Sequence, residues 1–334
     1  MSQNYKLAII GATGLVGRTV IKVLEERQLP ISEYYFFASS KSAGQTIYFN
    51  NRIYKVQELC ENSFDLGIDY AIFCAGGEIS KIYAPIAVSK KCIVIDNSSA
   101  FRMHENVPLV VPEVNLSDAY SNSGIIANPN CSTIQAVVAL KPLDIRFEIK
   151  RIVYSTYQAV SGAGQKGIKD LENTLKGLPS SKFPHPIFNN CIPHIDIFLD
   201  NGYTKEEVKM IQETRKILHR PNLNITATAV RVPVFNCHSE AINVEFNKNF
   251  KMSELKSILE NTPGVVLQDN PSKNLYPLAS NCSGKNEVFV GRLRRDFSVD
   301  SGINLWVVAD NVRKGAATNA IQILEGLINE NIAI

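Results

Sequence analysis

The chain has 334 residues, of which 45% are hydrophobic, so it can bury two cores and is expected to form two domains. Its 35 basic and 32 acidic residues give a formal net charge of +3 and are spread along the chain, which argues against nucleic acid or a membrane surface as a partner. No signal region opens the sequence, and no apolar run approaches the length of a membrane span. We therefore expect a soluble, cytoplasmic protein that binds anionic ligands at local sites.

Short, almost continuously apolar runs alternate with helix-like stretches up to residue 130. Apolar strands separated by helices are typical of a parallel sheet that is covered on both faces. The pattern predicts strands at 5–11, 33–40, 69–77, 92–99 and 108–115, and helices at 14–27 and 80–91.

The pattern changes after residue 130, where longer strand-like runs have few helices between them. Such runs occur at 149–162, 224–236, 239–246 and 287–296, and they predict a mixed or antiparallel sheet. A final helix is expected within 313–334, returning to the first domain. The expected division is therefore 1–130 with 313–334, a cofactor-binding domain, and 131–312, a catalytic and dimerisation domain.

Three glycines, Gly11, Gly14 and Gly17, follow the first strand and open the first helix in the run "IIGATGLVG". Glycines at such a turn let backbone N–H groups approach a pyrophosphate, which the helix dipole also favours. The spacing G-x-x-G-x-x-G differs from the commoner dinucleotide motif, and a plain strand-to-helix turn is the alternative.

The second strand ends in polar residues where a dinucleotide-binding protein would contact the adenosine ribose. An acidic residue there is typical of NAD binding, but this segment offers hydroxyl groups and a cation. They favour the 2′-phosphate of NADP over NAD, with a lysine on a solvated loop as the alternative. The residues are Ser39, Ser40, Lys41 and Ser42.

One of seven cysteines stands at the start of a predicted helix. Asn128, Pro129 and Asn130 are turn residues, and Ser132 with Gln135 forms a capping-box pattern before an apolar run. A thiolate at Cys131 would be stabilised by helix-start N–H groups and the dipole, as a nucleophile requires. A buried cysteine packed against the sheet is the alternative.

The odd number of cysteines, widely spaced and with no C-x-x-C pair, argues against a disulfide framework or a structural metal site, and we expect no metal.

Among the five histidines, His238 is the best candidate for a partner of Cys131, because it lies in a polar interruption between two strand-like runs. A satisfied turn histidine is the alternative. Seven residues earlier, Arg231 is flanked by apolar residues, and a guanidinium there is best explained by a bidentate carboxylate ligand.

Taken together, these residues resemble the aspartate-β-semialdehyde dehydrogenase family. The resemblance covers nearly the whole chain and is closer to the branch common in Gram-positive bacteria than to the enterobacterial one. It rests on the order of the segments "GATGLVG", "SSKSAG", "IDNSSAFR", "VPEVN", "ANPNCSTIQ", "YQAVSGAG", "EEVKMIQETRKIL", "VRVPVFNCHSE" and "ADNVRKGAATNAIQI".

The resemblance implies a role for each matching residue. Cys131 would be the nucleophile and His238 the general acid/base, and Gln158 would position the substrate. Arg231 would bind the α-carboxylate, while Arg102 and Lys209 would bind the acyl phosphate or phosphate. Asn130 would help helix-start N–H groups to stabilise an oxyanion.

Glu206 would address the substrate amino group or order the neighbouring cations. In the residues themselves, Thr204 and Glu207 predict a helix cap, and a solvated ion-pair face formed by Glu206, Lys209 and Glu213 is the alternative.

NADP is the cofactor that the resemblance implies. Lys41 stands where arginine is frequent in the family, which weakens the expected NADP preference. Cys237 stands where a small residue is frequent, and we interpret it as non-catalytic. The residues implied around the cofactor are Gly11, Thr13, Gly14, Leu15, Val16, Gly17, Ser39, Lys41, Ser42, Ser161, Gly162 and Asn311.

The implied fold is an α/β protein with a Rossmann-like, doubly wound parallel sheet domain and an α+β domain with a mixed or antiparallel sheet. The implied reaction is the reversible NADPH-dependent conversion of L-aspartyl-4-phosphate to L-aspartate-4-semialdehyde and phosphate, in lysine (diaminopimelate), threonine, methionine and isoleucine biosynthesis. A homodimer is expected, with a homotetramer as the alternative.

Three other functions stay open at this point. They are an N-acetyl-γ-glutamyl-phosphate reductase, a malonyl-CoA-type reductase, and a non-catalytic NADP-binding paralogue.

Overall fold

The computed structural model describes residues 4–330, which fall into two compact units. The first unit is formed by the chain up to Pro129 and from Ala316 onward, and the second by Asn130–Gly315. The last four residues of the expected C-terminal helix lie outside the described residues.

The first unit contains a six-stranded sheet in the order β5-β2-β1-β6-β7-β8, in which every neighbouring pair is parallel. The order runs outward in both directions from β1, as in a Rossmann-like fold, so a crevice opens where β1 and β6 end. The strands are β1 (Tyr5–Ile10), β2 (Ile31–Ala38), β5 (Gln57–Glu58), β6 (Tyr70–Phe73), β7 (Ile93–Asp96) and β8 (Ile125–Ala127).

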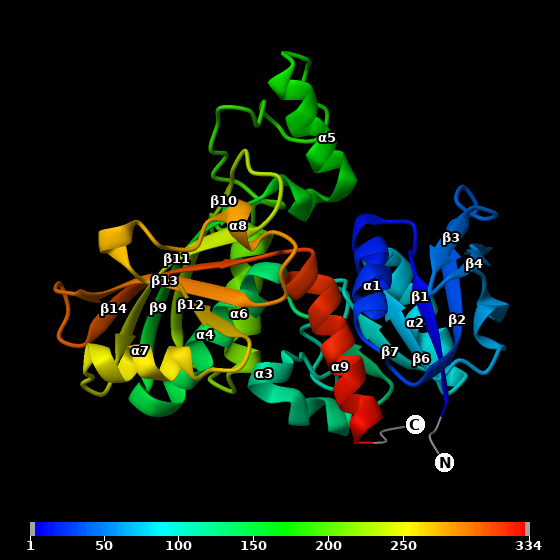
Figure 1. The fold of residues 1–334 in the computed structure, drawn as a ribbon, viewed down its shortest axis with the longest axis horizontal. Coiled ribbons are helices and arrows are strands. Elements are labelled where there is room, and N and C mark those ends of the chain that lie inside the picture. Colours follow the sequence, from blue (N-terminus) through cyan, green and yellow to red (C-terminus); the bar gives the residue numbers. More distant parts are fainter. Residues whose placement is uncertain (1–3, 331–334) are drawn as a thin grey trace. The chain divides into compact units, whose positions relative to one another are not determined.

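Both faces of this sheet are buried, which explains the continuously apolar strands. Leu7 and Ile9 pack in one core, and Ala8 and Ile10 pack in a second core on the other face. The first core includes side chains of α1 (Leu15–Glu26) and α9 (Thr318–Asn329), which lie side by side in Figure 1, and the second includes those of α2 (Gly77–Ser89).

One local expectation in this unit is wrong. Residues 108–115 form no strand, because only Leu109 bridges to Ala127, and the chain enters the short helix α3 (Pro112–Asn115), whose first position suits proline. The sequence interpretation also missed β8 and the hairpin formed by β3 (Thr46–Phe49) and β4 (Arg52–Lys55).

The second unit has a mixed sheet in the order β10-β9-β11-β14-β13-β12. The β10–β9 and β13–β12 pairs are parallel, and the three pairs between them are antiparallel. Its elements are β9 (Ile149–Gln158), β10 (Asn224–Arg231), β11 (His238–Phe246), β12 (Val265–Leu267), β13 (Val288–Asp296), β14 (Gly302–Ala309), α4 (Cys131–Phe147), α5 (Gly164–Leu175), α6 (Lys205–Ile217), α7 (Met252–Glu260) and α8 (Ala279–Cys282).

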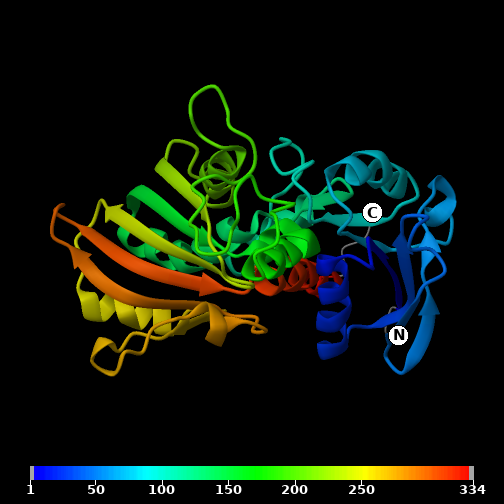
Figure 2. The ribbon, with the colours of Figure 1, turned by 90° about the horizontal axis from the view of Figure 1, so that it is seen from above.

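Helices α4, α6 and α7 contact this sheet, and Figure 2 shows α7 (yellow) along its face. Tyr154 of β9 points toward the helices, because its hydroxyl group hydrogen-bonds Thr214 of α6. The pairing of β9 with β11 and the alternation of side chains along a strand place His238 and Glu240 of β11 on the same face. This face therefore carries polar groups as well as the core of the unit.

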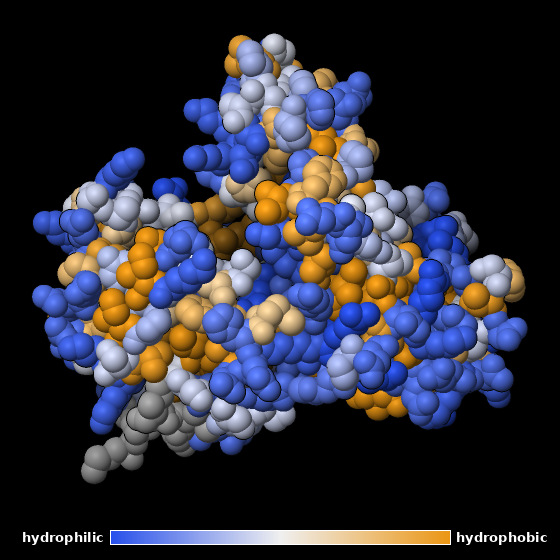
Figure 3. Space-filling view, turned by 180° about the vertical axis from the view of Figure 1, so that it is seen from behind, coloured by the Kyte–Doolittle hydropathy of each residue, from blue (hydrophilic) through white to orange (hydrophobic). Residues whose placement is uncertain are grey.

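Hydrophilic and hydrophobic residues are interspersed over the face drawn in Figure 3. None of the helices within residues 4–330 has the length and apolar character needed to span a bilayer.

The side chain of Glu240 gives a prediction for the pH dependence of stability. It is fully buried, neither carboxyl oxygen has a hydrogen-bond partner among the described residues, and burial raises its pKa well above 4.5. The folded state thus keeps a proton that the unfolded state releases, so the neutral group's contribution is complete below pH 4.5 and is lost as the pH rises toward the folded pKa.

Relative to Glu240→Gln, the wild-type protein should lose about 1.4 kcal/mol of stability per pH unit in that window. Thermal unfolding of both proteins between about pH 5 and about pH 8 measures this difference. Parallel pH profiles would show that Glu240 ionises in the folded protein.

Candidate active site

Cys131 is the first residue of α4 and is partly exposed. The helix cap is Asn130, whose extended backbone lets its Oδ1 accept hydrogen bonds from the N–H groups of Ser132 (3.0 Å) and Thr133 (3.4 Å). The expected capping box of Ser132 and Gln135 is wrong, because Ser132 already lies inside the helix. The prediction that Cys131 stands at a helix start is unaffected.

Several polar groups around this helix start are engaged within the protein, whereas the side-chain oxygens of Ser132 and Thr133 have no hydrogen-bond partner among the described residues. Asn130 takes up the N–H groups of Ser132 and Thr133, its own N–H donates to Glu213 Oε2 (2.6 Å), and its Nδ2 donates to Glu206 Oε1 (2.8 Å). Asn130 therefore positions the helix in this geometry, and the Ser132 and Thr133 N–H groups do not face a substrate oxygen.

Glu206 is buried between α6 and the start of α4. Its Oε1 accepts from Asn130 and from Gln158 Nε2 (3.1 Å), and its Oε2 lies 3.2 Å from Lys209 Nζ. Burial opposes ionisation most strongly, but the charge of Lys209, the two amide hydrogen bonds and the charge of Arg231 together outweigh it and lower the pKa of Glu206. The carboxylate is therefore charged at neutral pH.

Helix α6 begins with the expected capping box, in which Thr204 accepts from the Glu207 N–H and Glu207 accepts from the Thr204 N–H. The alternative of a solvated ion-pair face is wrong, because Glu213 as well as Glu206 is buried. Lys209 also donates to Asp196 (2.7 Å). Although burial lowers the pKa of Lys209, the two carboxylates raise it overall.

Arg231 ends β10 and is 6% exposed. Its Nη1 donates to Ala159 O (2.6 Å), and its guanidinium carbon lies 5.7 Å from the centre of the Phe183 ring. Burial lowers its pKa, while the charges of Glu206 and Cys131 act in the opposite direction. Arg231 thus acts electrostatically on both the buried carboxylate and the cysteine.

His238 is the first residue of β11 and is fully buried. Its Nδ1 accepts a hydrogen bond from the Ala159 N–H (3.0 Å), so a neutral ring carries its hydrogen on Nε2, which has no partner among the described residues. Burial, and then the charge of Arg231, hold the pKa of His238 well below 6.5. A Cβ on Gly162 would lie 3.1 Å from Nε2, so glycine keeps this side of the ring open.

Ser161 and Asn311, expected near the cofactor, contact the segment that leads into β11. Asn311 Oδ1 accepts from the Cys237 N–H (2.9 Å), and its side chain also hydrogen-bonds Ser161. Cys237 has φ of 73°, a left-handed conformation that favours glycine, and burial raises its pKa. Asn311 therefore stabilises the strained residue that precedes His238.

The other cysteines differ in their exposure to solvent. Cys92 and Cys282 are buried, whereas Cys60 and Cys191 are exposed. Within residues 4–330, no group of three or more histidine, cysteine or acidic side chains is arranged to hold a metal ion.

In the first unit, a cleft of about 510 Å³ lies where β1, β2 and β6 end. Gly11 has φ of +83°, and a Cβ there would come within 2.9 Å of the Cys74 backbone; a Cβ on Gly17 would lie 2.2 Å from Gly11 O. The glycines thus permit a tight turn into α1, as pyrophosphate binding at a helix start requires.

Of the expected cofactor residues, Gly11, Thr13, Gly14 and Ser39 line this cleft. Leu15, Val16, Gly17, Lys41 and Ser42 are not among its lining residues.

Sequence reasoning missed Glu58, which lines the cleft with Ser39 and Ser40. Its neighbour in the sheet is Ala38, because β5 pairs with the end of β2. Only this pairing register brings Glu58 to the cleft, and no local motif indicates it.

Arg102 belongs to the first unit and is buried. Its Nε donates to Asn128 O and its Nη2 to Asn97 O, both at 2.9 Å. Arg102 is therefore fixed against the chain segment that leads to Asn130.

A nucleotide cleft on a Rossmann-like sheet and a separate unit with a cysteine at a helix start define the class of nucleotide-dependent dehydrogenases. The chain matches "Semialdehyde dehydrogenase, NAD binding domain" over residues 6–122 and "Semialdehyde dehydrogenase, dimerisation domain" over residues 140–314. It is 54% identical to the aspartate-semialdehyde dehydrogenase of Aquifex aeolicus, over 98% of this chain and 99% of the relative. The chain belongs to the aspartate-semialdehyde dehydrogenase family.

Solved structures agree with this assignment. The structure of aspartate semialdehyde dehydrogenase II from Vibrio cholerae complexed with ASA has a TM-score of 0.94 and 48% identity, covering 98% of this chain and 99% of that one. The Candida albicans enzyme with NADP has a TM-score of 0.79 and 25% identity, covering 99% and 100%. The expected α/β architecture with a mixed second sheet is confirmed.

Glu58 gives a prediction for cofactor selectivity. A carboxylate at this position of the cleft would repel the extra phosphate of a bound NADP, and a charge pair about 4 Å apart in water is worth about 1 kcal/mol. Glu58→Gln should therefore lower the KM for NADP⁺ about fivefold more than the KM for NAD⁺. Steady-state kinetics with both cofactors measure the ratio, and Glu61→Gln, an exposed residue nearby in sequence, is the control. An unchanged ratio would place Glu58 away from the 2′-phosphate.

Proposed function

We propose that this chain catalyses the reversible NADPH-dependent conversion of L-aspartyl-4-phosphate to L-aspartate-4-semialdehyde and phosphate. The aldehyde is the branch point for lysine (through diaminopimelate), threonine, methionine and isoleucine. The observation that carries the proposal is the position of Cys131 at the start of α4, whose cap, Asn130, shares the Glu206 carboxylate with Gln158.

Cys131 is the proposed nucleophile. Its sulfur anion attacks the acyl carbon of aspartyl phosphate, the C–O bond to phosphate breaks, and inorganic phosphate leaves with the electron pair. The product is a thioester on Cys131, which divides a difficult reduction into two steps. The helix dipole and the charge of Arg231 both favour the sulfur anion.

The residues at the nucleotide cleft are suited to NADPH, which supplies the hydride that reduces the thioester carbon. Gly11 and Gly14 would hold the pyrophosphate against the start of α1, and Ser39 would face the adenosine ribose. Lys41, Ser42, Leu15, Val16, Ser161, Gly162 and Asn311 are proposed to complete the cofactor site.

Reduction leaves a hemithioacetal oxyanion on Cys131, and breaking its C–S bond releases the aldehyde. We propose that His238 stabilises both the oxygen and the sulfur anion by donating from Nε2, a buried donor that has no partner among the described residues. This geometry favours hydrogen-bond donation over full proton transfer, because loss of the Nε2 proton would leave an imidazolate. The general acid/base role would require the Nδ1 contact with Ala159 to change.

Substrate charge is matched by local groups. Arg231 is proposed to bind the α-carboxylate through the N–H groups that Ala159 does not use, and Glu206 to attract the α-amino group. Arg102 and Lys209 would bind the phosphate. We further propose that the second unit forms a homodimer, in line with the dimerisation domain that it matches, and that any homotetramer is built from such dimers.

Cys131→Ala should reduce turnover by about 10⁴-fold or more while leaving NADP binding intact, because it removes only the covalent step. Phosphate-dependent NADP⁺ reduction measures turnover, and equilibrium NADP⁺ binding measures cofactor affinity. Turnover at the wild-type rate in Cys131→Ala would eliminate the proposed nucleophile.

Arg231→Lys should raise the KM for aspartate semialdehyde by about tenfold or more before it lowers kcat, since lysine cannot make a bidentate contact. Phosphate-dependent NADP⁺ reduction at varied aspartate semialdehyde concentrations measures this effect.

A further inference from the structure

The loop between α5 and α6 contacts the backbone of Arg231. Ile192 and Arg231 exchange two hydrogen bonds, with the Ile192 N–H donating at 2.9 Å and the Arg231 N–H donating at 2.8 Å. The end of β10 therefore extends into this loop, and the position of Arg231 depends on how the loop is held.

The same loop covers the side chain of Arg231. Phe183 places its ring 5.7 Å from the guanidinium carbon, within the range of a cation–π contact. The ring packs against a small buried cluster that includes Val160, Leu171 and Ile192. Because the ring covers the guanidinium, it restricts the directions from which a carboxylate can approach the remaining N–H groups.

A single buried carboxylate holds the part of the loop that carries Phe183. Asp170 of α5 accepts at Oδ2 from Ser180 Oγ (2.8 Å) and the Phe183 N–H (3.3 Å). At Oδ1 it accepts from the Lys182 N–H (3.1 Å) and from Ser181 Oγ (3.0 Å) and N–H. Burial opposes its ionisation, but these hydrogen bonds lower the pKa of Asp170 overall.

We propose that Asp170 is a positioning residue for Arg231, which it orients through residues 180–183 and the ring of Phe183. The inference rests on the proposed function in one respect, namely that Arg231 binds the substrate carboxylate. Asp170 makes no contact with the cysteine site itself in the described structure, so its effect is on recognition of the carboxylate.

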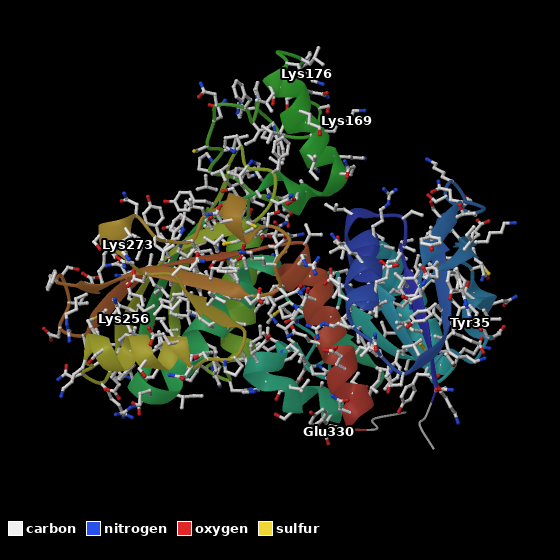
Figure 4. All side chains as sticks on the ribbon, in the orientation of Figure 1. Tyr35, Lys169, Lys176, Lys256, Lys273 and Glu330 are labelled. Atoms are coloured by element: carbon white, nitrogen blue, oxygen red, sulfur yellow. The ribbon has the colours of Figure 1, made fainter. Side chains whose placement is uncertain are left out.

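Asp170 differs in burial from the lysines that are near it in sequence. Lys169 on the same helix and Lys176 just after its last residue, both labelled in Figure 4, are exposed, whereas Asp170 is fully buried. Lys169→Ala is therefore a matched control, adjacent in sequence but directed to solvent.

The test compares Asp170→Asn, Phe183→Leu and the double variant with Lys169→Ala. Asparagine retains one acceptor oxygen but replaces the other with a donor, so it cannot accept from Ser180, Phe183, Ser181 and Lys182 together. Two aldehydes are used: aspartate semialdehyde and 3-aminopropanal, which lacks the carboxylate. Circular dichroism and thermal unfolding establish that each variant is folded.

Asp170→Asn and Phe183→Leu should each lower kcat/KM for aspartate semialdehyde about tenfold, mainly through KM, and change that for 3-aminopropanal less than about twofold. The double variant should lose little more than either single one, because both act on the same contact. Lys169→Ala should behave as the wild type.

Equal losses for both aldehydes, or full additivity in the double variant, would overturn the proposal. If Asp170→Asn does not fold, Phe183→Leu alone still decides whether the covering ring affects carboxylate recognition. Arg231→Lys distinguishes failure of the positioning role from failure of the proposed function of Arg231. If Arg231→Lys leaves kcat/KM for aspartate semialdehyde unchanged, the proposed role of Arg231 in binding the carboxylate fails. If Arg231→Lys lowers that kcat/KM but Asp170→Asn and Phe183→Leu leave it unchanged, the positioning role of Asp170 fails.

Discussion

The candidate active site depends on one buried carboxylate that remains charged. Glu206 is the common acceptor for the side chains of Asn130 and Gln158 and is paired with Lys209. Because Asn130 also caps α4, the carboxylate links the start of the cysteine helix to β9 and α6. Without it, the side chains of Asn130, Gln158 and Lys209 would each lose one partner, in a region where an unpaired buried group costs about 1–3 kcal/mol.

The second unit contains another buried glutamate with the opposite properties. Glu240 lies on β11 two residues from His238, but its oxygens have no hydrogen-bond partner among the described residues, and burial raises its pKa well above 4.5. Glu206 has two amide donors on Oε1 and the Lys209 ammonium on Oε2, and it stays ionised. Both carboxyl groups are buried, so it is their partners that shift their pKa values in opposite directions.

The sequence could predict those features of the fold and of the site that depend on a local pattern of apolar, polar and turn residues. Apolar runs predicted most strands of the parallel sheet, and the turn residues before Cys131 predicted a helix start. The cap itself was assigned to Ser132 instead of Asn130, because two polar residues on either side of Cys131 can each serve until the backbone conformation is known. Residues that act through distant pairing escaped detection: Glu58 reaches the cleft through β5–β2 register, and Asp170 acts on a loop ten or more residues away.

Covalent transfer through Cys131 is tested most directly by isolating the acyl-enzyme. The protein is mixed with aspartate semialdehyde and NADP⁺ without phosphate, quenched in acid and digested, and the peptides are analysed by mass spectrometry. We expect an aspartyl thioester on the peptide that contains Cys131, removable by hydroxylamine and discharged when phosphate is added before the quench. An adduct on another cysteine, or reduction of NADP⁺ in the first turnover with no acylated peptide, would contradict a mechanism through Cys131.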